Sequence, residues 1–202
     1  MLKKVRIAVL VSGGGTNLQA LLDARGNVLN HGDVALVVSN NADAYGLVRA
    51  QKAGIPTEVV QKKDLDSQEA FESRLVEILE AYSIDLIVLA GFMTILSEGF
   101  TSRYPDRIIN IHPSLIPSFC GEGFYGLRVH EAALDYGVKV TGATVHFVNE
   151  IPDGGRIIAQ KAVEVLPGDT PQTLQKRVME QAEWVLLPLA AEEVSISILG
   201  GI

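Results

Sequence analysis

The sequence predicts an α/β fold, in which a doubly wound and mostly parallel sheet carries an antiparallel extension toward its C-terminal end. Two observations lead to this prediction. Within the first ninety residues, short apolar runs rich in β-branched residues alternate with segments of helical periodicity, which is typical of parallel strands buried on both faces. Further on, two apolar runs flank a Pro-Asp-Gly-Gly turn at 152–155, which predicts an antiparallel pair. A length of 202 residues, with no repeat or linker, indicates one domain.

The expected elements follow in order along the chain. Strands are expected at residues 5–11, 34–39, 57–60, 84–91, 107–112, 142–148 and 156–165, about seven in all. The strand at 84–91 is the most apolar and is expected at the centre of the sheet, whereas 57–60 reads as an edge strand and 142–148 as a half-exposed one. Helices are expected after the glycines at 13–15, at 44–53, after a cap at Asp66 or Ser67, at 96–104, at 128–136, and from Pro171 with Thr170 as N-cap. Such an arrangement is Rossmann-like.

The composition excludes several classes of protein. With 48% hydrophobic and 20% charged residues, the chain has the balance of an ordinary globular protein rather than a disordered one. The 17 basic and 24 acidic residues give a formal net charge of -7, which argues against nucleic acid as a partner. An anionic ligand must therefore be held locally, by backbone N–H groups or by one or two well-placed cations.

Cysteine content and hydropathy predict a cytoplasmic protein. The only cysteine, Cys120, cannot form an internal disulfide, which fits a reducing compartment. The basic residues near the start lead into a β-like run rather than the apolar core of a signal peptide. No apolar run approaches the roughly 18 residues that a membrane-spanning helix needs, so no membrane contact is expected.

The stretch at 108–117 is the one around which the chain is organised. It begins as an apolar strand in which Asn110 and His112, two residues apart, point to the same side. Pro113 cannot donate to a strand ladder, so His112 lies at the carboxyl end of the strand, which is where open α/β sheets bind ligands. The alternative is that both are satisfied polar residues at a strand end.

A glycine loop at 13–15 is the second candidate site. Its backbone can approach a ligand closely, and the free N–H groups at the start of the following helix, at Thr16 and Asn17, favour an anion such as a phosphate monoester. No Lys-Ser/Thr pair follows, so the loop is not a Walker motif, and it fits the dinucleotide fingerprint poorly. A tight turn without any ligand is the alternative.

Asp153, between Pro152 and two glycines, is the third candidate. Alone, this pattern is usually a hairpin turn. An amide, an imidazole and a carboxylate brought together would form an acid–base and oxyanion set. No nucleophile accompanies them, since Ser12, Ser114 and Cys120 lack a supporting context. The histidines at 112, 130 and 146 and the cysteine have no recognised ligand spacing, so no metal is expected.

Four segments of the sequence resemble a known family. They are residues 11–20, 89–93, 109–117 and 144–148, together with Asp-Gly-Gly at 153–155. In order and spacing, from residue 5 to about 190, the chain resembles the phosphoribosylglycinamide formyltransferases, folate-dependent enzymes of purine synthesis. The wider superfamily shares the Asn-x-His and Asp set, and includes methionyl-tRNA formyltransferase and formyltetrahydrofolate deformylase. The glycine loop, with neither an N-terminal regulatory domain nor a C-terminal tRNA-binding domain, favours the first family.

The resemblance implies a role for particular residues. It implies that Asn110, His112 and Asp153 are catalytic. It also implies that Gly15, Thr16 and Asn17 bind the phosphate of the ribonucleotide. Glu183 would meet the substrate amine and ribose. The pocket for 10-formyltetrahydrofolate, the co-substrate, would be formed by Met93, Thr94, Ile95, Leu96, Asn110 and Gln68. Residues 1–91 would form the nucleotide-binding half and 92–190 the folate-binding and catalytic half, while the tail at 195–202 has no assigned role. The partners would be these two small molecules, and the protein a monomer or homodimer.

Some features depart from the family pattern. The family commonly carries arginine at the positions of Gln68 and Thr94. The loop at 118–126 is longer than the family's, and the helix before Glu183 is one residue longer. The peptide bond between Ile116 and Pro117 is expected to be cis, as it is in relatives. The expected reaction is formyl transfer to a primary amine, and the alternatives are hydrolysis of the formyl-folate or a nucleotide-binding regulatory module without activity.

Overall fold

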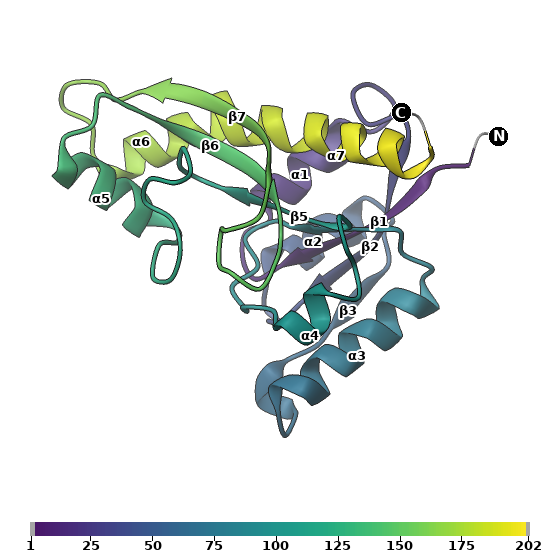
Figure 1. Cartoon of the computed structure of the whole chain (residues 1–202). Coiled ribbons are helices and arrows are strands. Elements are labelled where there is room, and N and C mark those ends of the chain that lie inside the picture. The colour runs from purple at the N-terminus through teal and green to yellow at the C-terminus, as the bar shows by residue number, and fades with distance from the viewer. Residues whose placement is uncertain (1–2, 201–202) are drawn as a thin grey trace.

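The computed structural model describes residues 3–200 and contains one seven-stranded sheet in the order β3-β2-β1-β4-β5-β6-β7 (Figure 1). The strands are β1 Val5–Val11, β2 Gly32–Ser39, β3 Thr57–Val59, β4 Leu86–Leu89, β5 Ile108–His112, β6 Val140–Phe147 and β7 Ile157–Glu164. The helices are α1 Thr16–Asp23, α2 Tyr45–Lys52, α3 Gln68–Ala81, α4 Glu98–Thr101, α5 Leu127–Tyr136, α6 Pro171–Val178 and α7 Trp184–Ile198. The first five strands in chain order pair in parallel, and β6 and β7 pair antiparallel, so the predicted fold class is confirmed.

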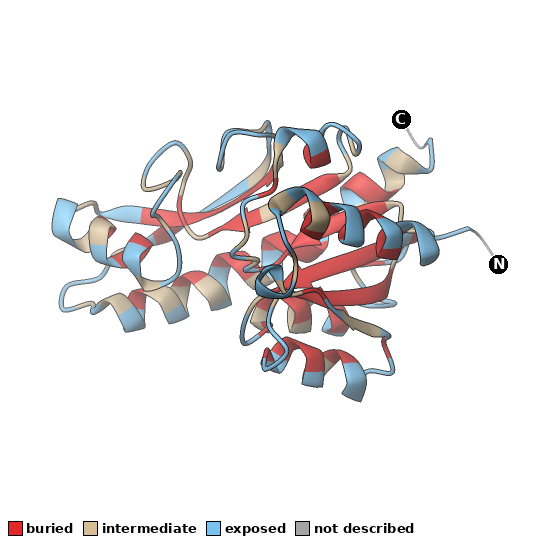
Figure 2. Ribbon diagram, turned by 90° about the horizontal axis from the view of Figure 1, so that it is seen from below, coloured by how far each residue is buried: buried red, intermediate tan, exposed pale blue. Residues whose placement is uncertain are grey.

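Helices cover both faces of the sheet because successive strand side chains alternate between them. In β1, Ile7 and Val9 pack into the core beneath α1, α2 and α7, whereas Ala8 and Leu10 pack against α3 and α4 on the opposite face. The central strands are accordingly buried on both faces (Figure 2). The expected positions of the central strand β4 and the edge strand β3 are both confirmed.

The prediction that 142–148 is half exposed is wrong, because six of the eight residues of β6 are buried. This strand lies between β5 and β7, and α7 packs against one of its faces. The polar side chains of the other face are covered as well. Thr144 accepts a hydrogen bond from the backbone N–H of Ile116 and donates to the carbonyl of Ser114, both in the segment that follows β5.

The C-terminal helical region differs from the single helix expected. Thr170 caps α6 in a capping box with Thr173, and Pro171 occupies its first turn as predicted. A π-helical turn, Met179–Glu183, then separates α6 from α7. Such a turn accommodates one extra residue within a helix, which matches the extra residue noted in the sequence. Of the unassigned tail, Ser195–Ile198 continues α7, whereas 201–202 lie outside the described residues.

The parallel strands β1, β4 and β5 end at the same edge of the sheet, and this edge positions the candidate site. The glycine loop follows β1, residues 91–96 follow β4, and Pro113 follows β5. The peptide bond between Ile116 and Pro117 is cis, as expected. Among residues 3–200, no helix is long and apolar enough to span a membrane.

Candidate active site

Three of the predicted residues meet at this edge of the sheet. Asn110 and His112 come from β5, and Asp153 comes from the turn between β6 and β7. The Nδ2 of Asn110 lies 3.4 Å from Oδ1 of Asp153, and the Nδ1 of His112 lies 3.4 Å from Oδ2 of the same carboxylate. Segments about forty residues apart in the sequence thus bring an amide, an imidazole and a carboxylate into contact.

The two glycines after Asp153 allow the turn to lie against β6. A side chain at Gly155 would place its Cβ 1.7 Å from the carbonyl oxygen of Phe147, so only glycine fits there. Asp153 itself has a φ of 56°, in the left-handed region that non-glycine residues rarely adopt. The backbone of this turn is therefore fixed by close contact, which directs the carboxylate toward β5.

The charges of the cluster depend on one another. Burial lowers the pKa of His112, while the carboxylate of Asp153 and the carbonyl of Phe119 act in the opposite direction. Burial also opposes ionisation of Asp153, but the adjacent ring of His146, the charge of His112 and the N–H of Gly121 together hold the pKa of Asp153 below its ordinary value. Asp153 is thus a carboxylate at neutral pH, and it faces an imidazole that gives up its proton readily.

The loop at 118–126 contacts both titratable residues. The Nε2 of His112 donates to the carbonyl of Phe119 at 2.9 Å, and the N–H of Gly121 donates to Oδ2 of Asp153 at 2.8 Å. With Nδ1 facing Asp153, both ring nitrogens of His112 lie against acceptors, an arrangement that suits an imidazolium. Sequence reasoning left the role of this loop open, and the structure makes it part of the wall of the site.

Two cavities meet at the cluster. The larger, of ≈ 630 Å³, is bounded by the 118–126 loop, by Met93 and by residues of the C-terminal helical region that include Gln175, Met179 and Glu183. The smaller, of ≈ 120 Å³, is lined by Leu89, Phe92, Thr94, Ile95, Leu96, His146 and the 148–153 segment. Asn110 and Asp153 line both of them. Ligands in the two cavities would therefore both contact these residues.

The glycine loop is held in place by α2. Gly15 has a φ of 68°, and a Cβ on it would lie 2.6 Å from the Cα of Gly46. The N–H of Gly46 donates to the carbonyl of Gly13, and Nε of Arg49 donates to the carbonyl of Gly14. Because these carbonyls are bound by α2, the free N–H groups at the start of α1 remain as the polar feature of the loop.

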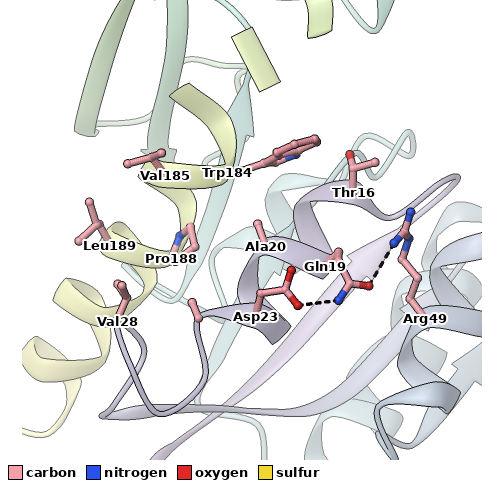
Figure 3. A pocket seen from close by; sticks show the side chains of 11 residues that line it. Thr16, Gln19, Ala20, Asp23, Val28, Arg49, Trp184, Val185, Pro188 and Leu189 are labelled. Carbon is pink, nitrogen blue, oxygen red and sulfur yellow. Dashed lines mark hydrogen bonds between the residues drawn. The ribbon is translucent and has the colours of Figure 1, made fainter. Parts of the chain in front are cut away.

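Of the three predicted phosphate residues, Thr16 and Asn17 lie at two different cavities, and Gly15 lines neither of them. Asn17 lines the large cavity beside the cluster. Thr16 lines a third cavity of ≈ 490 Å³ between α1 and α7, which also exposes Gln19 and Arg49 (Figure 3). That cavity is mainly apolar, and neither Asn110, His112 nor Asp153 lines it, so we do not assign the chemistry to it.

Glu183, predicted to meet the substrate, lies beside Asn17. It is buried in the π-helical turn, and its Oε2 accepts a hydrogen bond of 2.7 Å from Nδ2 of Asn17. Burial raises the pKa of Glu183 to about 7, although the hydrogen bond from Asn17 opposes the shift. This carboxyl group therefore changes its charge near neutral pH at the wall of the large cavity.

Of the residues predicted to bind folate, Gln68 lines neither of the two cavities that meet at the cluster. Its Nε2 donates instead to the carbonyl of Ile95 and to the buried carboxylate of Glu72. Thr94 accepts a hydrogen bond from Nδ2 of Asn40. At the two positions where the resemblance implies arginine, this chain thus has two neutral residues that make hydrogen bonds within the protein and support residues 94–95 after β4.

His146 is the site residue that sequence reasoning missed. It is buried in β6 directly opposite Asn110, and its Nε2 lies 3.1 Å from Nδ2 of Asn110. From the sequence, metal binding was the only function considered for it, because the contact between the two side chains becomes evident only from the antiparallel register of β5 and β6.

In the described part of the chain, no group of three or more His, Cys, Asp or Glu residues could hold a metal ion.

His130 is expected to make stability depend on pH. Burial, with a smaller effect from the charge of His112, lowers the pKa of His130 to about 4, and neither ring nitrogen has a hydrogen-bond partner within residues 3–200. His130 therefore binds a proton more tightly in the unfolded chain than in the folded protein. The free energy of unfolding should consequently fall by about 2–3 kcal/mol as the pH drops from about 6.5 to 4. Urea unfolding across this range measures the slope, and His130→Met should flatten it. Equal slopes in both proteins would contradict this origin.

Comparisons with known proteins assign a family to this geometry. The profile of a family described as Formyl transferase matches residues 5–190. The phosphoribosylglycinamide formyltransferase of Escherichia coli (strain K12) is 44% identical over 185 residues, which are 92% of this chain and 84% of the relative. The crystal structure of glycinamide ribonucleotide transformylase 1 from Symbiobacterium toebii matches with a TM-score of 0.89 and 44% identity, covering 96% of this chain and 89% of that one.

A longer relative contains a similar segment within a larger protein. The trifunctional purine biosynthetic protein adenosine-3 of Bos taurus is 47% identical over 193 residues, which are 96% of this chain. This chain spans 18% of the length of that relative.

Proposed function

Because this chain belongs to the formyl transferase family, we propose that it transfers the formyl group of 10-formyltetrahydrofolate to the primary amine of 5-phosphoribosylglycinamide. The products would be formylglycinamide ribonucleotide and tetrahydrofolate, a step of purine synthesis. Relatives named for this activity support the proposal over hydrolysis.

The observation that carries the proposal is the shared wall of two cavities. Asn110 and Asp153 line both the ≈ 630 Å³ and the ≈ 120 Å³ cavity. A reaction between two bound molecules needs such a junction, because positioning both reactants beside the catalytic groups removes much of the entropic barrier. A hydrolase would need only one organic ligand, with water as its second reactant.

In the proposed reaction the amine attacks the formyl carbon, and the carbonyl oxygen becomes an oxyanion. The Nδ2–H of Asn110 and the protonated His112 stabilise that charge. Asp153 holds the imidazolium in place and, through an ordered water, passes the amine's proton toward the folate nitrogen as the bond from carbon to that nitrogen breaks. In the free protein the Nε2–H of His112 donates to the carbonyl of Phe119, so the formyl oxygen would replace this acceptor. No covalent intermediate with the protein is needed.

The substrates would be held by separate groups. We assign the phosphate to the N–H groups of Gly15, Thr16 and Asn17 at the start of α1, where geometry and helix dipole favour an anion. Glu183 would meet the amine and ribose. We assign the folate to Met93, Thr94, Ile95 and Leu96, with Asn110 at the formyl group. Gln68 would act indirectly, through its hydrogen bond to the carbonyl of Ile95. Residues 1–91 and 92–190 remain our proposed nucleotide-binding and folate-binding halves.

Absorbance of the folate, followed with and without the ribonucleotide, tests the proposed activity. We expect tetrahydrofolate to form only when the ribonucleotide is present. Formate release independent of the ribonucleotide would support the hydrolase instead. Stoichiometric nucleotide binding without folate turnover would support a regulatory module.

Substitution of Glu183 should weaken binding of the ribonucleotide. With a pKa of about 7, Glu183 becomes a carboxylate as the pH rises from 6 to 8, so apparent affinity for the ribonucleotide should rise over that range. Glu183→Gln should raise KM for the ribonucleotide about tenfold at pH 8, because it replaces a charged acceptor with a neutral one, and should remove this pH dependence. Glu180→Gln, at an exposed position in the same turn, is the matched control. An unchanged KM in Glu183→Gln would contradict the assignment.

A further inference from the structure

We propose that His146 is a positioning residue, which fixes the side-chain amide of Asn110 so that its NH2 group, and not its carbonyl oxygen, faces the reacting formyl group. The inference rests on the proposed formyl transfer. It assigns to a buried histidine outside the three catalytic residues a specific task in the reaction.

The register of the sheet brings the two side chains together. His146 lies directly opposite Asn110 in the antiparallel pairing of β5 and β6. The pairing of β6 with β7 shifts register between Val145 and His146, and irregularities of this kind redirect side chains near active sites. His146 is 1% exposed, so its ring nitrogens must find partners within the protein.

The contacts of the imidazole define its tautomer. Nδ1 lies 2.8 Å from the carbonyl oxygen of Phe147, which can only accept a hydrogen bond. Nδ1 therefore carries a proton, and in the neutral ring Nε2 presents a lone pair. Nε2 lies 3.1 Å from Nδ2 of Asn110 and 3.5 Å from Oδ1 of Asp153. Because Nδ2 is the nearer atom and carries two hydrogens, the lone pair of Nε2 accepts one of them.

The reversed orientation of the Asn110 amide is disfavoured by the same groups. Turned over, its carbonyl oxygen would face the lone pair of His146 and the Asp153 carboxylate, whose Oδ1 lies 3.4 Å from the present Nδ2. Three acceptors would then face one another without a proton between them. His146 makes the shorter of the two contacts. The hydrogen bond from Asn110 to His146 also persists during the reaction, when the other amide hydrogen of Asn110 turns from Asp153 to the oxyanion.

Kinetics of a double-mutant cycle test this role. His146→Phe keeps a ring of similar size but removes the acceptor, so we expect kcat to fall about tenfold or more, with KM for both substrates changed less than about twofold. His146→Gln can place its side-chain oxygen near the position of Nε2 and should keep most of the activity. In an Asn110→Ala background, His146→Phe should change kcat less than about twofold, because there is no amide left to orient. An equal loss in both backgrounds, or wild-type kcat in His146→Phe, would overturn the proposal.

A measurement independent of turnover separates this inference from the proposed function. Long-range 1H–15N correlation spectra of the wild-type protein, with the signals of His146 assigned by comparison with His146→Gln, report which ring nitrogen carries the proton. We expect the proton on Nδ1 and a hydrogen-bonded, unprotonated Nε2. A proton on Nε2 alone would overturn the inference even in an active enzyme. The absence of formyl transfer in the wild-type protein would overturn the proposed function while leaving the tautomer open to measurement.

Discussion

Replacement of Asn110 by alanine is expected to lower kcat by roughly 10²–10³, which is the usual cost of removing one oxyanion donor from a buried site. The amide has contacts with both His146 and Asp153, and it lines both cavities, so its removal takes away a donor that the site holds in place. Steady-state kinetics with both substrates saturating measures the effect, and KM should change much less than kcat.

Asn30→Ala is the control for this experiment, since that side chain is exposed and donates to the carbonyl of Asn27 in its own loop. It should leave both constants unchanged. Turnover of Asn110→Ala within about threefold of the wild-type value would exclude the oxyanion role, because that role requires a loss of more than about 2.5 kcal/mol of transition-state stabilisation.

Asp153→Asn should lower kcat by roughly 10²–10⁴, within the range of contributions from a positioned acid or base. The substitution removes the charge that keeps the pKa of His112 from falling further, so less imidazolium would be present at neutral pH. It also removes the group that passes the proton. Asparagine keeps the size of the side chain and can still accept from the N–H of Gly121, so the turn should remain folded.

The pH profile distinguishes this explanation from simple damage to the site. The lost charge predicts that the residual activity of Asp153→Asn is greatest at a lower pH than in the wild type, where more of His112 is protonated. Asp106→Asn, which alters an exposed ion pair with Arg156, is the matched control. A wild-type pH profile in Asp153→Asn, with kcat reduced less than about tenfold, would contradict the proposed coupling to His112.

Much of the architecture follows from local sequence patterns. Continuous apolar runs such as 5–11 and 84–91 have few alternatives to buried parallel strands, and proline at 113 ends β5 so that His112 lies at the edge of the sheet. Capping chemistry is local too, so the start of α6 at Pro171 was predictable. The grouping of Asn110, His112 and Asp153 was implied by the family resemblance rather than by shared strand ends, because Asp153 follows a strand that runs antiparallel to β5.

Features that depend on contacts between distant segments could not be read from the sequence. The alternation in β6 resembles that of a half-exposed strand, but the segment after β5 covers its polar face. The partnership of His146 with Asn110 depends on a register that two separated strands adopt only when they pair. The contacts of the 118–126 loop with the site arise because glycines and a left-handed Phe119 fold it back over β5.

The fate of the formyl carbon tests the central claim most directly. Wild-type protein would be incubated with the ribonucleotide and 10-formyltetrahydrofolate carrying 13C in its formyl group, and the products analysed by mass spectrometry. Direct transfer predicts one labelled formylglycinamide ribonucleotide for each tetrahydrofolate formed, and no labelled formate. Labelled formate as the main product, or tetrahydrofolate formed in excess of the labelled ribonucleotide, would contradict direct transfer between two substrates that meet at Asn110 and Asp153.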